Sequence, residues 1–286
     1  MRAGYAAERY GVSLAEAKAF LDRQDAELEA ATKADEIVLW FEHDQFDQII
    51  LIRLLDWFAA HKVPIDRLSL ICIDAYPGID PFYGIGQLDG EALNALFPQR
   101  APITKSQMAL ARRAWRAYRA PDPQNLERLL AEDTSALPFL AGALLRHFED
   151  FPATLDGLAR TERQALLATH DGGQSAAVVF AASQAMEEAP WCGDTMFWGW
   201  LRAMASARLP ALVLDGPADW FRQPDGPRNT TVGLTRAGYA LSRGAVDWAR
   251  MGGAERWMGG VRLEGPMPAW RWDGAKRRLV AGGGRG

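Results

Sequence analysis

One pattern in the first sixty residues constrains the fold of this chain more than any other. An apolar, β-favouring run at Ile37–Phe41 leads into the polar residues Glu42, His43 and Asp44, and a long amphipathic pattern begins at Gln45. This order predicts a strand, a turn and a helix. In an open α/β sheet, the turn after the carboxyl end of a strand faces the ligand crevice. Three ionisable side chains are therefore predicted to lie where such folds carry out their chemistry.

A second apolar run, at residues 68–73, predicts a second buried strand. Because a helix separates the two strands, we expect a right-handed β-α-β unit with parallel strands. The loop that follows starts at Asp74, which we expect to lie beside the turn after the first strand. This loop has roughly fourteen residues, and loops of that length inside compact domains are usually functional or mobile. Within it, Gly84-Ile85-Gly86 lacks the third glycine that a phosphate-binding loop requires.

Two further patterns predict where helices begin. Ser13 and Glu16 form a capping box, which opens a helix that should run to about residue 33. Asp44 and Asp47 fit an N-cap and a negative charge in the first helical turn. Half of the polar turn therefore has a purely structural interpretation as well as a chemical one.

A chain of 286 residues allows one large domain or two modest ones, and we predict two. Residues 1–152 should form an α/β domain, with a small parallel sheet and helices, followed by a helical region. Residues 153–286 read as three helices and then short strands, the order of a winged-helix-like α+β domain. The expected helices are 160–169, 175–188 and 194–207, and the expected strands are 211–214, 231–234, 261–263, 269–272 and 278–280.

The C-terminal half offers weak signals for a macromolecular partner. The third expected helix carries Phe197, Trp198 and Trp200, whereas a helix that reads DNA should expose polar and basic side chains. Residues 276–278 are basic and are candidates for phosphate contacts. The dipeptide Asp273-Gly274 is typical of a type I′ hairpin turn. Contact of residues 153–286 with DNA or with a protein is thus the expectation.

Composition narrows the class of protein. Hydrophobic residues make up 49% and charged residues 24%, which is typical of a globular protein. Arg53 and Asp56 interrupt the longest apolar run, so no membrane contact is expected. The N-terminus lacks the apolar core of a signal peptide, and Cys72 and Cys192 lack metal or disulfide spacing, which together predict a cytoplasmic location.

Charge is unevenly distributed along the chain. Residues 1–154 carry a net charge of −7 and the remaining residues +3, within a total of −4. The pI of about 5.7 argues against a general coat for nucleic acid, but a basic C-terminal half permits a local anionic contact.

Three hypotheses for function follow, and we rank them in this order. The first is a ligand-binding or regulatory protein with a small anionic or nucleotide-like ligand at the strand-end crevice. The second is a metal-dependent hydrolase, because carboxylates are hard ligands for divalent cations and histidine can act as a ligand or general base. The third is a protein-interaction scaffold, in which tryptophans anchor an interface. The catalytic candidates are Glu42, His43 and Asp44; the ligand-binding candidates are Asp47, Gln48, Asp74, Gly84, Gly86 and Gln87; the candidates for a divalent metal are Glu42, His43, Asp44 and Asp74.

Several segments resemble the bacterial domain-of-unknown-function 1835 family over nearly the whole chain. The family implies no established activity. Its members usually begin with a further strand and polar loop, so the resemblance implies an N-terminally short member that lacks the first β-α segment. The segments are residues 39–48, 77–88, 134–152, 157–168, 234–238 and 256–263.

Overall fold

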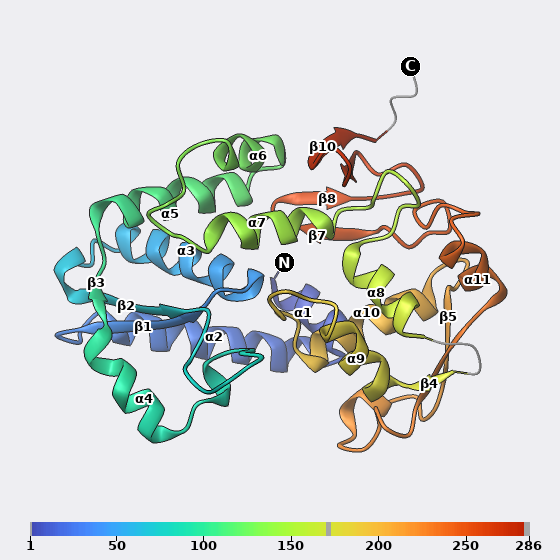
Figure 1. The fold of residues 1–286 in the computed structure, drawn as a ribbon, viewed down its shortest axis with the longest axis horizontal. Helices are drawn as coiled ribbons and strands as arrows, with labels where there is room; N and C mark the ends of the chain where they lie inside the picture. The colour runs from blue at the N-terminus through green and yellow to red at the C-terminus, as the bar shows by residue number, and fades with distance from the viewer. Residues whose placement is uncertain (1, 170–172, 283–286) are drawn as a thin grey trace. The chain divides into compact units, whose positions relative to one another are not determined.

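The computed structural model describes residues 2–169 and 173–282, and within them the chain forms a mixed α/β structure of helices and small sheets (Figure 1). The sheets contain two or three strands each. None of the helices in this part of the chain is long and apolar enough to cross a membrane.

The chain divides into two compact units. Unit 1 contains the residues up to Tyr118 together with Arg128–Leu144, and unit 2 contains Arg119–Glu127 together with the residues from Leu145 on. The chain passes between the units after Tyr118, within α6 (Gln124–Leu130) and within α7 (Leu140–Glu149). The boundary after residue 152 stays a prediction.

The sheet of unit 1 has the order β1-β2-β3. The strands are β1 (Ile37–Glu42), β2 (Leu68–Ile73) and β3 (Ala101–Pro102). The first two are parallel, with Ile37 opposite Leu68 and Glu42 opposite Ile73, and the short β3 runs antiparallel to β2. The apolar runs therefore form the predicted parallel pair, and their carboxyl ends meet at one edge.

Helix α3 (Gln45–Ala60) lies between this sheet and α5 (Lys105–Tyr118) (Figure 1). It buries Leu51, Ile52, Leu55 and Phe58, all at most 1% exposed. Full burial of such side chains stabilises the fold by roughly 1.5–3 kcal/mol each. This packing fixes the first turn of α3 at the carboxyl end of β1.

The remaining helices of unit 1 are α1 (Arg2–Tyr10), α2 (Leu14–Ala31) and α4 (Gly90–Leu96). The Ser13 capping box is confirmed, since its hydroxyl accepts from the Glu16 amide and the Glu16 carboxylate accepts from the Ser13 amide. Phe46, in the first turn of α3, is 44% exposed, because the helix turns that residue away from the core.

After α7, the described residues of unit 2 form four α-helices and four pairs of neighbouring strands. The helices are α8 (Arg160–Ala168), α9 (Ala176–Gln184), α10 (Asp194–Ser206) and α11 (Arg236–Ser242); the strands are β4 (Gln174–Ser175), β5 (Leu212–Asp215), β6 (Thr231–Leu234), β7 (Arg256–Met258), β8 (Val261–Leu263), β9 (Trp270–Asp273) and β10 (Arg278–Ala281). One antiparallel sheet has the order β4-β6-β5, and β7-β8 and β9-β10 form separate antiparallel pairs. The hydrophobic core of unit 2 includes Phe197, Leu201, Val232 and Trp248.

The expected hairpin near the C-terminus is present, but its turn differs from the prediction. Strand β9 ends at Asp273 and β10 begins at Arg278, so the loop spans four residues. The Asp273 carboxylate accepts from the Lys276 amide, and Arg277 has a φ of +49°. Asp273-Gly274 therefore starts a longer loop and is not a two-residue type I′ turn.

Arg146 is the centre of a buried ion network in unit 2. Its guanidinium lies 3.1 Å from Asp150 and 2.7 Å from Glu187, and it donates to the Thr161 hydroxyl. The side chains of both acidic partners are at most 3% exposed. Because buried charges are tolerated only when paired, these contacts tie α7 to α8 and to the end of α9.

Candidate functional site

The turn between β1 and α3 positions three carboxylates. Glu42 is the last residue of β1, Asp44 is the N-cap of α3, and Asp47 lies in the first turn of that helix. Asp44 Oδ1 accepts from the amides of Phe46 and Asp47, at 2.6 and 3.0 Å. Asp47 Oδ2 accepts from the Glu42 amide at 2.7 Å. These bonds turn the chain from β1 into α3, so Asp47, which a continued straight strand would point to the face opposite Glu42 and Asp44, lies beside them.

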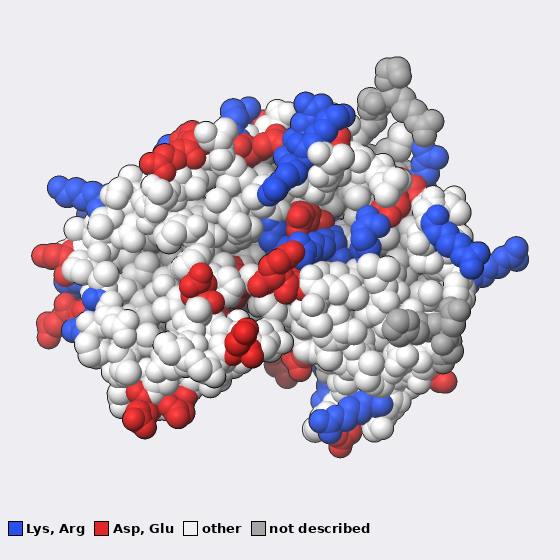
Figure 2. Space-filling model, viewed as in Figure 1, with Lys and Arg blue, Asp and Glu red and all other residues white. Residues whose placement is uncertain are grey.

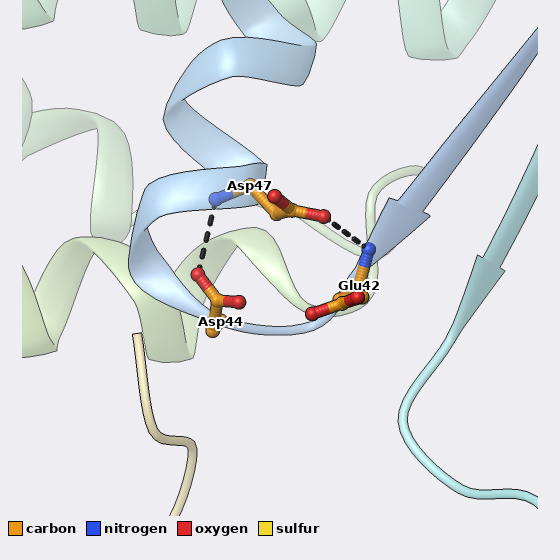
Figure 3. A group of neighbouring side chains, drawn as sticks. All are labelled: Glu42, Asp44 and Asp47. Atoms are coloured by element: carbon orange, nitrogen blue, oxygen red, sulfur yellow. Dashed lines mark hydrogen bonds between the residues drawn. The ribbon is translucent and has the colours of Figure 1, made fainter. Parts of the chain in front are cut away.

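The three carboxylates form one cluster, in which ligand atoms lie within 4.8 Å of one another. Figure 3 shows the carboxyl groups of Glu42 and Asp44 turned toward each other, with Asp47 beside them. Within the residues that the structure describes, one oxygen of each carboxylate accepts these hydrogen bonds and the other oxygen accepts none. The cluster therefore has three oxygens available to a ligand.

The loop after β2 reaches the same cluster. The Ile85 amide donates to Glu42 Oε1 at 2.5 Å. Gly84, at a φ of +152°, brings its backbone so close that an added Cβ would overlap the Glu42 carboxylate. The backbone conformation favours a glycine here, and a Cβ at this position would displace the Glu42 carboxylate. This backbone contact joins the loop to the end of β1.

Burial and like charge govern the electrostatics of the cluster. Burial raises the pKa of Asp44 to about 7, against the opposing effect of the Asp47 and Phe46 amides, and the neighbouring Asp47 and Glu42 charges add to the rise. Burial also raises the pKa of Glu42 and that of Asp47 above their ordinary values. The three groups thus resist carrying three negative charges together, and a bound cation would relieve that repulsion.

Gln48 and Cys72 lie next to the cluster and form hydrogen bonds at the end of β1. Gln48 is 1% exposed, and its amide nitrogen donates to the Glu42 carbonyl at 2.6 Å and to Cys72 Sγ at 3.3 Å. Burial raises the pKa of the Cys72 thiol to about 11, so the thiol stays protonated at neutral pH. Gln48 was a ligand-binding candidate from the sequence; in the structure its amide nitrogen holds the end of β1.

Other candidates from the sequence lie outside the cluster. His43 packs edge-on against Phe139 with ring centroids 6.0 Å apart, and its Nδ1 is buried without a hydrogen-bond partner among the described residues. Asp74 is exposed beyond the end of β2. Gln87 accepts from the Tyr83 and Gly84 amides, which folds the loop upon itself. The exposed Gly86 has open space where a Cβ would lie.

Two members of the site were missed or misplaced by sequence reasoning. Asp47 was expected to bind ligand but not metal, although its spacing of three from Asp44 indicates the same face of a helix start. The Ile85 amide was not expected at all, because a main-chain N–H leaves no signature in the sequence.

Comparison with known proteins adds no further candidate. No family model, curated protein or solved structure matches this chain. The chemistry of the site is therefore argued from its geometry.

The spacing of the carboxylates suits a divalent cation. Oxygens that bind Ca²⁺ at roughly 2.3–2.6 Å lie at most about 5 Å apart, whereas those on Mg²⁺ lie at most about 4 Å apart. The 4.8 Å limit of this cluster therefore fits a cation of the size of Ca²⁺ directly. A Mg²⁺ ion would require the side chains to close further.

Proposed function

We propose that this protein is a ligand-binding or regulatory protein that holds a divalent cation at Glu42, Asp44 and Asp47. The observation that carries the proposal is the convergence of three carboxylates within 4.8 Å, with the pKa of each raised. Carboxylate oxygens are the ligands that Ca²⁺ and Mg²⁺ prefer. In the cation-free protein the three carboxylates repel one another, and a cation that binds between them relieves this repulsion, which favours its binding.

The same cluster supports a specific mode for the anionic or nucleotide-like ligand. Three carboxylates repel an anion, so direct binding at this edge is unfavourable. A cation held by the cluster reverses the local charge and can bind a phosphate or carboxylate group of the ligand. We infer that ligand binding at this site depends on the cation.

Isothermal titration calorimetry with CaCl₂ and MnCl₂ at pH 8 tests the proposal. We expect one saturable site in the wild-type protein and at least roughly tenfold weaker binding in Glu42→Gln and Asp47→Asn. Asp89→Asn is the matched control, because Asp89 is an exposed helix N-cap outside the cluster. Absence of saturable binding, or equal affinity in all four proteins, would contradict the proposal.

A metal-dependent hydrolase is the second candidate function. It is favoured by the same three carboxylates, because a cation held there could lower the pKa of a bound water and so supply a nucleophile at neutral pH. The test is release of p-nitrophenol from bis(p-nitrophenyl) phosphate with Mn²⁺ present. Turnover that disappears in Asp44→Asn supports a hydrolase at this cluster, and turnover that survives in this variant shows that the reaction does not need Asp44 as a ligand.

We also propose that residues 153–286 contain a winged-helix-like arrangement that contacts a protein. The order α8, β4, α9, α10, β5, β6 and the sheet order β4-β6-β5 support the fold. The exposed residues of α10 are Asp194, Thr195, Ala203 and Ser206, a set without positive charge. Its single arginine, Arg202, lies 4.0 Å from the Phe221 ring. A helix of this kind is poorly suited to read DNA.

The distribution of charge also favours a protein partner over DNA. On the face drawn in Figure 2, Lys and Arg side chains stand in separate groups with acidic and uncharged side chains between them. Fluorescence anisotropy with a labelled 20-base-pair duplex tests this choice. We expect no saturable binding, and binding that weakens steeply with salt would redirect the proposal to DNA.

Family and location are part of the same proposal. We infer that the chain is a member of the domain-of-unknown-function 1835 family, on the strength of the segments that resemble it. We propose a cytoplasmic location for the protein, because neither Cys72 nor Cys192 forms a disulfide among the described residues.

A further inference from the structure

The loop after β2 is folded upon itself and has few polar contacts with the rest of the described part of unit 1. Residues 76–88, which we call the strap, contain an isolated bridge between Tyr76 and Ile79 and a short 3-10 turn at Ile85–Gln87. The Gln87 side chain accepts from the amides of Tyr83 and Gly84 and donates to the Pro81 carbonyl. These bonds all lie within the strap and keep it preassembled.

A single hydrogen bond connects the strap to the rest of the described chain. It runs from the Ile85 amide to Glu42 Oε1. The acceptor is a carboxylate, and charge-assisted bonds of this kind are stronger than neutral ones. At one end the strap is also anchored by Leu88, which is 9% exposed, next to the start of α4. Release of this bond therefore removes the hydrogen bond that holds the middle of the strap to the end of β1, while Leu88 keeps its end in place.

Glu42 has two roles that meet at one carboxyl group. Oε1 accepts from the strap, while Glu42 as a whole belongs to the three-carboxylate cluster. In the absence of a cation, repulsion from Asp44 and Asp47 favours movement of the Glu42 carboxylate away from them, and such movement weakens the bond to Ile85. A cation on the cluster removes that repulsion and holds the Glu42 carboxylate in place.

We propose that residues 76–88 form a strap that is closed by the Glu42 carboxylate and locked when a cation occupies the cluster. The proposal rests on the proposed function for its cation, but closure by Glu42 stands independently of it. Coupling of this kind is reciprocal: the cation stabilises the closed strap, and the closed strap strengthens cation binding by the same factor. Binding of the cation thereby changes the conformation of the strap on unit 1.

Gly84 and Gly86 provide a matched pair of variants. An alanine at Gly84 places its Cβ onto the Glu42 carboxylate and requires a φ of +152°, so Gly84→Ala should hold the strap open. Gly86 lies two residues away, and a Cβ there meets no atom within 4 Å. Gly86→Ala adds the same methyl group in the same loop, but without an overlap with Glu42. Glu42→Gln provides a second perturbation, because it keeps an acceptor oxygen but removes the charge.

Hydrogen exchange of the Ile85 amide, followed by nuclear magnetic resonance or mass spectrometry, tests closure without any metal. With EDTA present, we expect exchange roughly tenfold faster in Gly84→Ala than in the wild type, and wild-type exchange in Gly86→Ala. Circular dichroism establishes that the variants are folded. If Gly84→Ala does not fold, Glu42→Gln takes its place, with faster exchange again expected. Equal exchange in the wild type and the perturbed variant overturns the strap.

Addition of Ca²⁺ or Mn²⁺ then tests the lock. We expect Ile85 exchange to slow roughly tenfold in the wild type and cation affinity to fall by a similar factor in Gly84→Ala. Calorimetric binding without any change in Ile85 exchange overturns the lock but leaves the cation site. Absence of binding by calorimetry overturns the proposed function and the lock together, while the metal-free exchange still decides whether Glu42 closes the strap.

Discussion

Replacement of Asp44 by asparagine separates its structural role from its electrostatic one. Asparagine and aspartate are about equally good N-caps, so Asp44→Asn retains the bonds to the Phe46 and Asp47 amides. The substitution removes only the charge, at a side chain that is 6% exposed. We expect the variant to be more stable than the wild type at pH 8 and of similar stability near pH 4.

The direction follows from the pKa of Asp44. Its folded value of about 7 lies above the ordinary value of 3.8, so the folded state binds the proton more tightly than the unfolded state does. The stability that the neutral form contributes is fully present below pH 3.8 and is lost progressively as the pH rises from there to about 7. Each unit of difference corresponds to about 1.4 kcal/mol, so the upper limit of the loss is about 4 kcal/mol. Because Asp44 titrates together with Glu42 and Asp47, the loss of stability that belongs to Asp44 alone is smaller than this limit.

Urea denaturation followed by circular dichroism at pH 4.5 and pH 8, with EDTA present, measures the effect. Asp89→Asn is the control, because Asp89 also caps a helix, through a 2.9 Å bond from the Ala92 amide, but is exposed. Its effect should be about the same at both pH values. The reasoning is refuted if Asp44→Asn is less stable than the wild type at pH 8, or if its effect does not change with pH.

Three further outcomes follow from the same structure. Calorimetric affinity for Ca²⁺ should weaken roughly tenfold per pH unit below about pH 7 and level off above it, because the cation must displace the Asp44 proton; a flat profile would exclude Asp44 as a ligand. Arg146→Ala should lower the free energy of unfolding by about 3–5 kcal/mol, because it removes the ion-pair partner of the buried Asp150 and leaves the buried Glu187 paired with Arg160 alone. Arg113→Ala, at an exposed pair, should change it by at most about 1 kcal/mol, and similar losses in urea denaturation would contradict this account. Cys72 should react with a thiol reagent far more slowly in the folded protein at pH 7 than after unfolding, as monitored by absorbance, and equal rates would show that its thiol is neither buried nor raised in pKa.

Local signals predicted the parts of the fold whose causes lie close together in sequence. The Ser13 capping box, the Asp44 N-cap and the two apolar strands each depend on residues a few positions apart, and each forms as expected. Elements whose cause lies elsewhere in the chain were not predicted. Strand β4 has only two residues and exists because Gln174 pairs with Val232, far along the chain.

The candidate site shows the same division. The sequence placed Glu42 and Asp44 together, because both belong to one turn. It also placed Asp74 beside them, since parallel strands end at a common edge, yet Asp74 remains outside the cluster. The approach of Gly84 to Glu42 depends on how a long loop folds back, and neither residue type nor spacing encodes that contact.

Anomalous diffraction from a wild-type crystal grown at pH 8 and soaked in MnCl₂ tests the central claim most directly. The account predicts one strong manganese peak between the carboxylates of Glu42, Asp44 and Asp47, at roughly 2.0–2.6 Å from an oxygen of each. The Gly84–Ile85 backbone should lie against Glu42 in the same crystal. A crystal with no peak at this turn, or with manganese bound only elsewhere on the protein, would contradict the account.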